Sequence, residues 1–520
     1  MVERPAVAGR VRPPLSRTAL ALLLAAFAGA TALRLVGVAD SPLTFHPTRQ
    51  FLGLRVARAE YLAGRPDVPA AVRLAVQLNE RSAPQLEVRL LEAAVVAGYH
   101  LLGGERVWLG GTLSSILWVL LGGACLFLIA RRLALGEVAA AVAVAFYLFL
   151  PYAITASRSF QPDPAMVAFM LAALLALLRH HDNPTAARLA LAAALSASAI
   201  LVKPTVMFVI VGAMAALAVS RAGLRGLVQR QTLTLFLLSL LPATVFYVHA
   251  IVAGTAVSSN AETSFIPGLF RQAAYWRGWL HIVNGTVGTA FVLAAALSIV
   301  VARRREARMV VAGLLAGYLV YGLVFNYHIH THDYYSLPLI PIVALGLGLV
   351  ADAAVARVRR MDLSPVVKVA SGAALAVLGA SLLSAGLDAA RLHASPSPAA
   401  VAAQSRAIGE VVSHSTRTVM LAPAYGSPLS FFGNLSGSSW PSAASGDFRA
   451  MRLRGEWVPS TRQLFDRMRR SGAQWFIVTD LGELGRQPEL MPLLDREARL
   501  AAGGPGYLVY DLRVRGPGPS

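Results

Sequence analysis

The sequence predicts an α-helical polytopic membrane protein of about 11 transmembrane helices, followed by a small C-terminal α/β domain. The chain is 56% apolar with a mean hydropathy of +0.58, which excludes an ordinary soluble protein. Apolar runs of about 20 residues, each able to cross a hydrocarbon core, recur up to residue 387. No run of that length follows, and the remaining residues are rich in Pro, Ser and Gly.

The first apolar run, 18–38, follows a basic tail, 1–17, that we expect to be cytoplasmic and disordered. The run carries Arg34 near its end, from where a long side chain can reach the interface. It has no A-x-A cleavage pattern, so we interpret it as a retained anchor. Ten further spans are predicted, at 107–130, 133–152, 163–178, 186–202, 204–220, 232–254, 286–302, 309–326, 335–351 and 366–387.

The net charge of +20 comes almost entirely from arginine, since Lys203 and Lys368 are the only lysines. The arginines gather in alternate short loops, which fits the positive-inside rule better than nucleic-acid binding. They predict a multi-pass protein of the cytoplasmic (inner) membrane with its N-terminus inside and residues 388–520 outside. The single cysteine, Cys125, excludes an intramolecular disulfide and a thiolate metal cluster.

The first outer loop, 39–106, is too long for a plain linker. Segments 47–63 and 86–102 each have an apolar side, which indicates amphipathic helices lying along the interface. A small globular loop domain is the alternative. In the extracytoplasmic part, helices are expected at 401–412, 461–471 and 489–501, and strands at 418–422, 475–479 and 506–512. This alternation is typical of a small α/β domain.

The turn TASRSFQPDP, 155–164, holds Arg158, Gln161 and Asp163 between two apolar runs. Asp163 opens the next helix, where the helix dipole favours an acidic group, and it must face protein or water. The turn is either a simple helix cap or part of a site. With the predicted topology, further polar residues reach the same membrane surface, namely Asp40, His46, Arg49, Gln50, Glu87, Lys203, His328, His330, His332, Asp333, Tyr334 and Tyr335.

Lys203 interrupts a long apolar stretch, AILVKPTV, in a chain that otherwise avoids lysine. A buried ammonium needs an anionic partner, and a lipid-linked phosphate is a suitable one. The alternative is a hairpin charge that reaches interfacial water. The alternating His328, His330 and His332 would hold a divalent metal if they lay on a strand. The segment lies at a helix end, however, where hydrogen bonding to a polar substrate is the simpler interpretation, and no metal ligand is assigned.

Five stretches, in order, are similar to the polytopic GT-C glycosyltransferases, specifically the family-39-like group of protein O-mannosyltransferases and the lipid A aminoarabinose transferase. They are FHPTRQ, the segment APQLEVRLLEAAVVAGYHLLGGERVWLGGTLSSIL, RSFQPDPAMVAFM, AILVKPTV and HDYYSLPLIP. The resemblance covers roughly residues 18–350. It implies a GT-C-like transmembrane domain over 18–387.

The resemblance also implies a polyprenyl-phosphate sugar donor and inverting transfer to an acceptor hydroxyl on a glycan, lipid or protein outside the membrane. Lys203 would hold the lipid phosphate, with Arg158 or Arg49 assisting, and Asp163 matches the second acidic position of the family. Substrate contacts would come from the polar residues that lie in or beside these motifs, namely Gln50, Gln161, His332, Asp333, Tyr334 and Tyr335.

One motif departs from the family pattern. The family has an acidic residue, often an Asp-Glu pair, shortly after the first span, and this sequence has His46 and Pro47 there. The catalytic base is therefore Asp40, His46 or Asp163, and imidazole is chemically suited to the role near neutral pH. Two other functions stay open: a lipid-linked substrate transporter or flippase, and an inactive scaffold for envelope glycan assembly. The absence of an internal repeat counts against transport.

Overall fold

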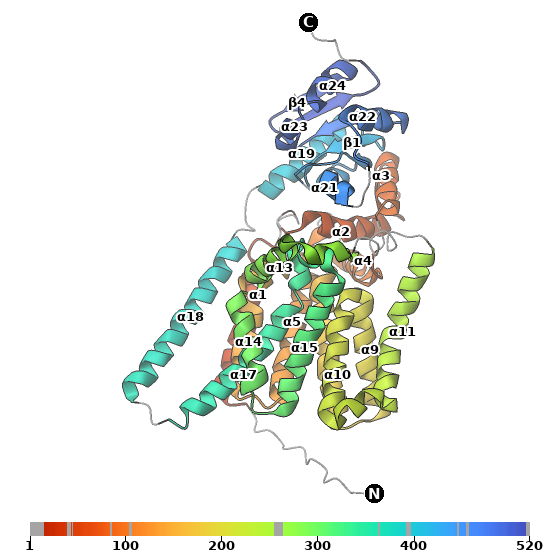
Figure 1. The fold of residues 1–520 in the computed structure, drawn as a ribbon. Coiled ribbons are helices and arrows are strands. Elements are labelled where there is room, and N and C mark those ends of the chain that lie inside the picture. The colour runs from red at the N-terminus through yellow and green to blue at the C-terminus, as the bar shows by residue number, and fades with distance from the viewer. Residues whose placement is uncertain are drawn as a thin grey trace.

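The computed structural model describes residues 15–38, 43, 45–83, 86–102, 107–253, 264–361, 364–391, 397–444, 447–453 and 457–515. A bundle of long helices forms one end of the molecule, and a mixed α/β unit sits at the other (Figure 1). Short helices of the first loop lie between them, across the end of the bundle. The predicted tail 1–17 lies almost wholly outside the described residues, as does Asp40.

A helix covers each of the eleven predicted spans, and the chain is a multi-pass membrane protein. Seven helices of the described chain are long and apolar enough to cross a membrane, or eight if one bent pair counts as a span. Helices α6 and α9 are shorter, and α18 extends beyond residue 387. The bundle contains α1 (Arg17–Leu35), α5 (Val107–Arg132), α6 (Glu137–Phe149), α7 (Pro151–Ala156), α8 (Pro162–Asp182), α9 (Ala186–Val202), α10 (Met207–Ala222), α11 (Arg230–Val252), α14 (Thr289–Val301), α15 (Arg305–Val324), α17 (Leu339–Val358) and α18 (Pro365–Arg391).

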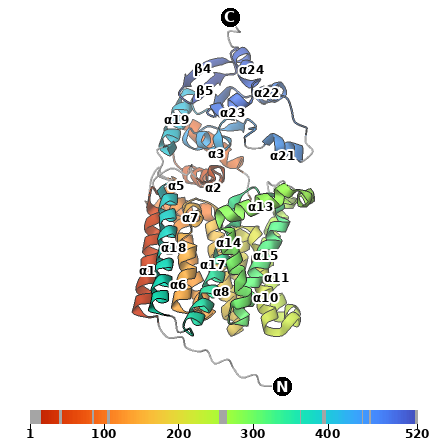
Figure 2. The ribbon, with the colours of Figure 1, turned by 60° about the vertical axis from the view of Figure 1, so that its left-hand side comes forward.

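The predicted span 286–302 is preceded by a sharp bend that was not expected. Helix α14 continues from α13 (Ala273–Thr286) through a break with an 89° bend, and α13 lies across the end of the bundle (Figure 2). Gly288 sits at this break with φ +90°, a backbone conformation that glycine adopts without steric cost. The predicted span therefore corresponds to α14, and α13 is a separate helix that the apolar pattern did not predict.

Helix α8 is the centre of the bundle, and its first turn carries Asp163. In the most apolar stretch of α8, 78% of the residues are buried, whereas only 17% are buried in the corresponding stretch of α1. Small residues bring other helices close together: a side chain on Gly313 of α15 would overlap the backbone carbonyl of Gly212 on α10. Such close approach is how helices gain packing contacts in lipid, where helix association has no hydrophobic driving force.

The described part of the first loop contains three helices. Helices α2 (Pro47–Leu62) and α4 (Leu90–Leu102) lie at the end of the bundle, and α3 (Ala70–Arg81) stands beside the C-terminal part (Figure 1). The apolar sides of segments 47–63 and 86–102 predict α2 and α4, whereas α3 was not expected. Helix α3 packs Val72 and Val76 against Ala59 of α2. The loop is therefore a small helical layer, intermediate between the two alternatives considered from sequence.

The C-terminal part contains a five-stranded mixed sheet of order β2-β1-β3-β5-β4. Strands β1 (Thr418–Leu421), β2 (Gly437–Ser439) and β3 (Trp475–Val478) are parallel, whereas β5 (Tyr507–Asp511) runs antiparallel to both β3 and β4 (Arg499–Gly504). Helices accompany the sheet, namely α19 (Ser397–Val411), α20 (Ser427–Phe432), α21 (Asp447–Leu453), α22 (Thr461–Arg470), α23 (Leu481–Arg486) and α24 (Leu490–Glu497). The predicted helix 489–501 was wrong at its end, because residues from Arg499 onward form β4.

A buried carboxylate organises one loop of this part of the chain. Glu483 accepts hydrogen bonds from the backbone N–H groups of Ala443 and Ala444 and from the Gln487 amide. Burial alone would raise the pKa of Glu483, but these hydrogen bonds outweigh it and hold that pKa below its ordinary value.

The C-terminal part contacts the first-loop helices directly. Phe51 of α2 packs against the rings of Phe431 and Phe432, with centroids 5.2 and 5.7 Å away. The amide of Asn79 on α3 donates a 2.8 Å hydrogen bond to the carbonyl of Leu435. The layer that covers the bundle is thereby held from both sides, which fixes the position of α2.

Candidate active site

The candidate residues come from four places where helices begin or end, and a proline stands at three of them. Pro47 opens α2 after His46, and Pro162 opens α8 next to Asp163. Pro204 follows Lys203, whose backbone is extended and ends α9. Proline disfavours the α conformation in the residue before it and lacks an N–H, so helices end or begin at these points. The fourth place is the 3₁₀ turn Asp333–Ser336 before α17.

Lys203 and Asp163 form a buried ion pair. Nζ of Lys203 lies 2.7 Å from Oδ1 of Asp163, and the two side chains are 4% and 0% exposed. The second carboxylate oxygen of Asp163, Oδ2, is buried without a hydrogen-bond partner among the described residues. Lys203 thus has the anionic partner that a buried ammonium requires. The partner is the Asp163 carboxylate, whose second oxygen has no donor among the described residues.

Two tyrosine rings complete the surroundings of the ammonium. Nζ of Lys203 lies 4.7 Å from the ring centre of Tyr334 and 4.2 Å from that of Tyr335. Cation–π attraction of this kind contributes about 0.5–2 kcal/mol, more when the cation is desolvated. The motif HDYYSLP therefore meets the Lys203 motif in space.

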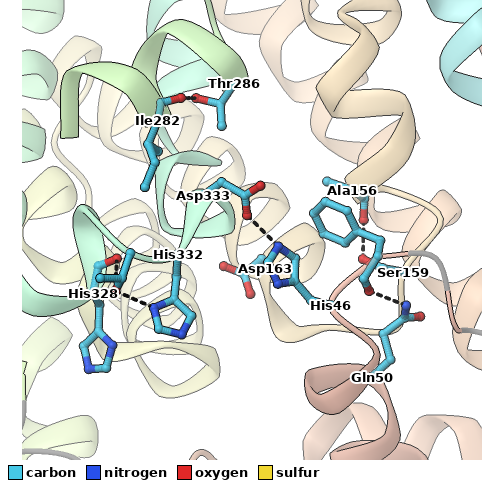
Figure 3. Close-up of polar contacts among 12 residues, drawn as sticks. His46, Gln50, Ala156, Ser159, Asp163, Ile282, Thr286, His328, His332 and Asp333 are labelled. Carbon is cyan, nitrogen blue, oxygen red and sulfur yellow. Dashed lines mark hydrogen bonds and ion pairs between the residues drawn. The ribbon is translucent and has the colours of Figure 1, made fainter. Parts of the chain in front are cut away.

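His46 and Asp333 form a second pair beside the first. Nε2 of His46 lies 2.5 Å from Oδ1 of Asp333, and both side chains are about one-third exposed, at 31% and 38%. Asp163 lies next to this pair (Figure 3). The ring of His46 also meets Tyr334 edge-on, with centroids 4.7 Å apart. Tyr334 consequently contacts both pairs.

The backbone of His46 is left-handed, with φ 44° and ψ 59°, immediately before Pro47. This conformation costs a non-glycine residue roughly 1–2 kcal/mol. Strain of this size persists where surrounding structure imposes it, and it is concentrated at functional sites.

Arg49 and Glu87 form a third pair, close enough to the first for the Asp163 carboxylate to act on the Arg49 charge. Nη2 of Arg49 lies 2.5 Å from Oε1 of Glu87, and both side chains are largely buried. Although burial disfavours its charge, the Glu87 carboxylate raises the pKa of Arg49 above its ordinary value. Both residues line a small pocket of about 40 Å³ that Gln161 also lines. The Gln161 side chain is buried, and neither its oxygen nor its nitrogen has a hydrogen-bond partner among the residues described.

Gln50 and Arg158 make contacts that hold the backbone in place. The Gln50 amide donates to the Phe45 carbonyl at 2.6 Å and accepts from the Phe160 N–H at 2.9 Å. The Arg158 guanidinium donates to the carbonyls of Ala390, at 3.0 Å, and Val36. Gln50 therefore connects α2 to the turn before α8, and Arg158 connects that turn to the ends of α1 and α18.

The prediction that the Arg34 side chain reaches the membrane interface is wrong. The side chain is fully buried and donates to Ser157 Oγ at 2.6 Å and to the carbonyls of Ala30 and Leu148 at 3.0 and 2.9 Å. The reason is that Ser157 and two carbonyls satisfy the guanidinium inside the bundle. Sequence reasoning missed this support of the turn, although an arginine inside an apolar run was a usable signal.

The three alternating histidines do not lie along a strand. His328 belongs to the short helix α16 (Asn326–Ile329) and its ring lies 5.6 Å from that of His332, whereas the ring of His330 meets Tyr275. His328 hydrogen-bonds to Ser264 at 3.1 Å and His330 to the Asn326 carbonyl at 2.7 Å. Burial, reinforced by His46 and Lys203 nearby, lowers the pKa of His332 to about 4, so this imidazole is neutral near pH 7. Within the described chain no group of three or more His, Cys, Asp or Glu could hold a metal ion.

Comparison with known proteins gives one family match and several structural matches. Residues 90–251 match the family model described as dolichyl-phosphate-mannose-protein mannosyltransferase. This segment contains α8 with Asp163 and the α9 end with Lys203. No curated protein sequence matches the chain.

The structural matches extend over nearly the whole chain. ArnT from Cupriavidus metallidurans in the apo state aligns with a TM-score of 0.59 at 16% identity, covering 96% of this chain and 100% of that one. The same protein bound to undecaprenyl phosphate aligns with a TM-score of 0.58 at 16% identity, covering 95% and 98%. The oligosaccharyltransferase from Archaeoglobus fulgidus aligns with a TM-score of 0.56 at 12% identity, covering 88% of this chain and 69% of that one. This chain therefore has the GT-C fold of polytopic membrane glycosyltransferases, as its motifs predicted.

Proposed function

We propose that this protein transfers a sugar from a polyprenyl-phosphate donor to an acceptor hydroxyl, with inversion at the anomeric carbon, on the outer side of the cytoplasmic membrane. The observation that carries the proposal is the adjacency of two pairs, Lys203–Asp163 and His46–Asp333, with Tyr334 touching both. One pair offers a cation for a phosphate and the other a base for a hydroxyl. The fold and the mannosyltransferase segment support the same reaction class.

His46 is the base in this proposal. Its contact with Asp333 is the arrangement in which a carboxylate orients an imidazole and stabilises the charge the imidazole acquires. The acceptor oxygen attacks the anomeric carbon, its proton passes to the free ring nitrogen of His46, and the bond from that carbon to the phosphate oxygen breaks. This assignment replaces the acidic pair that the family carries after the first span. Asp40, the other candidate from that loop, lies outside the described residues.

Lys203 and Arg49 would stabilise the departing lipid phosphate. An ammonium has three donors, and the structure commits one of them to Asp163. Donors aimed at a leaving group's developing charge in a low-dielectric site are among the strongest contributions to catalysis. Asp163 would keep Lys203 charged and oriented, and its unpartnered Oδ2 would accept a hydrogen bond from a substrate hydroxyl. Gln161, His332 and Tyr335 would contact substrate as well.

The test is transfer from a panel of radiolabelled polyprenyl-phosphate sugars in membranes that contain the full chain. The wild type is compared with His46→Ala, Asp333→Asn and Lys203→Met. The exposed His249, on α11, provides a matched control as His249→Asn. We expect label to leave the lipid with the wild type and the control only, and Asp333→Asn to retain a small fraction of the rate because His46 is still present.

Each result bears on a different part of the proposal. Full activity of His46→Ala would remove the base assignment, and full activity of Lys203→Met would remove the phosphate assignment. A folded wild type that transfers label from no donor would overturn the enzyme and favour the scaffold. Movement of intact labelled lipid between leaflets, with no transfer, would favour a flippase.

A further inference from the structure

A second polar pocket lies at the opposite end of the bundle from the candidate active site. It is formed where α8 and α10 end and α11 begins, at the lower end of these helices in Figure 1. Its volume is about 50 Å³. The proposed reaction makes no use of it.

The pocket is apolar on one side and polar on the other. The apolar side comes from the helix walls, namely Leu177, Met214, Leu217, Ala218 and Leu235. The polar side comes from the helix ends, namely His180, His181, Arg221, Gln229, Gln231 and Thr232. No carboxylate lines it. This division matches a phospholipid, which places a phosphate at the level of the helix ends and acyl chains along the helices.

The charges at the pocket favour an anion. Arg221 has no hydrogen bond or ion pair to any described residue. Asp182, the residue after His181, and Glu306 are both engaged by Arg132. His180 is 8% exposed, and its Nδ1 is buried with no hydrogen-bond partner among the described residues. The pocket thus offers an uncompensated guanidinium and an unused imidazole nitrogen.

The chain beside the pocket is shaped for the membrane interface. The 3₁₀ turn η2 (Gly223–Val228) folds back on α10, and a side chain at Gly226 would overlap the carbonyl of Ala218. The same turn exposes Leu224 and Val228 by 78% and 71%. Exposed apolar side chains next to a basic pocket are typical of segments that insert into the headgroup layer.

We propose that this pocket binds the phosphate headgroup of an anionic phospholipid in the adjacent leaflet. Arg221 and His180 contact the phosphate, Gln231 and Thr232 contact the rest of the headgroup, and the acyl chains lie against Leu217 and Leu235. Basic pockets between transmembrane helices bind anionic lipids in this way. The inference is independent of the proposed sugar transfer, because it concerns other residues at the other membrane surface.

The experiment is native mass spectrometry of the purified full chain in detergent, titrated with dioleoylphosphatidylglycerol or dioleoylphosphatidylcholine. Arg221→Gln removes the proposed phosphate contact, and Arg225→Gln removes an arginine of the same surface that does not line the pocket. Both side chains are exposed, so neither change should affect folding. We expect Arg221→Gln to weaken phosphatidylglycerol binding about fivefold, as expected for one basic residue near anionic lipid, and Arg225→Gln to leave it unchanged.

A third arm uses inorganic phosphate as competitor. Failure of millimolar phosphate to displace the lipid, together with the Arg221 dependence, supports a lipid site. Arg221-dependent binding of inorganic phosphate without selective binding of phosphatidylglycerol would assign the pocket to a soluble phosphate and overturn the proposal. Equal affinity for the two lipids, or equal weakening in both variants, would also overturn it.

Discussion

The Lys203–Asp163 pair is the contact whose removal should change this protein most. At 2.7 Å, and with an effective dielectric constant of about 20, the Coulomb attraction is roughly 6 kcal/mol. Much of this offsets the several kcal/mol that each ion loses by leaving water. Replacing one partner alone should therefore destabilise the protein by about 3–5 kcal/mol, since the other charge stays buried and unpaired.

The double variant separates this effect from simple packing loss. Lys203→Met leaves Asp163 unpaired, Asp163→Asn leaves Lys203 unpaired, and the combined variant leaves no charge. We expect Lys203→Met to cost more than Asp163→Asn, because it also removes the cation–π contacts with Tyr334 and Tyr335. The double variant should cost less than the sum of the single changes by up to about 3 kcal/mol.

The assay is SDS-induced unfolding of the detergent-solubilised chain, followed by far-ultraviolet circular dichroism, beside the transfer assay. Additive losses in the double variant would refute the reasoning, since independent sites add. We expect the double variant to be more stable than the sum of the single losses predicts, but to remain inactive in transfer. This combination would separate the pair's structural contribution from its proposed role at the phosphate.

Three further predictions follow from single positions. His46→Gly should be about 1 kcal/mol more stable than His46→Ala in the same unfolding assay, because only glycine relieves the left-handed backbone, and equal stability would contradict the strain. Gly313→Val should reduce stability by at least about 1–3 kcal/mol through overpacking against Gly212, whereas Gly98→Ala, with open space around it, should not. The lowered pKa of Glu483 means that its stabilisation is fully present above the ordinary carboxyl pKa and is lost as the pH falls through the lowered value. Intrinsic-rate-corrected hydrogen exchange of residues 440–444 should therefore lose protection towards pH 3 in the wild type, while Glu483→Gln should have weaker protection that depends little on pH.

The membrane part was predictable because its signal is local. A run of about 20 apolar residues must form its backbone hydrogen bonds internally and becomes a helix wherever it packs. Two errors in the rest of the fold have physical causes. Helix α3 lies in a polar loop and is defined by packing on α2. Strand β4 is defined by its pairing with β5, which no property of residues 499–504 alone encodes.

The site was predictable as a set of residues but not as a set of contacts. Interrupted apolar runs identified Asp163 and Lys203, and the topology placed both at one surface. Their pairing depends on how α8 and α9 pack, and the pairing of His46 with Asp333 joins positions 287 residues apart in the chain. Distances of this kind depend on the tertiary structure alone. The strand that the metal interpretation of the histidines requires is not formed, since His328 lies in the helix Asn326–Ile329.

The pairing has a consequence for how a phosphate would bind. Lys203, His46 and Arg49 each face a carboxylate before any substrate arrives. A lipid phosphate that displaced Asp163 would leave a buried carboxylate beside its own charge, which is strongly unfavourable. The phosphate therefore has to approach the donors of Lys203 that Asp163 does not use. Under the proposed function, Asp163 and the phosphate share the ammonium, and neutralising Asp163 should strengthen binding of the phosphate product while removing the orientation that transfer requires.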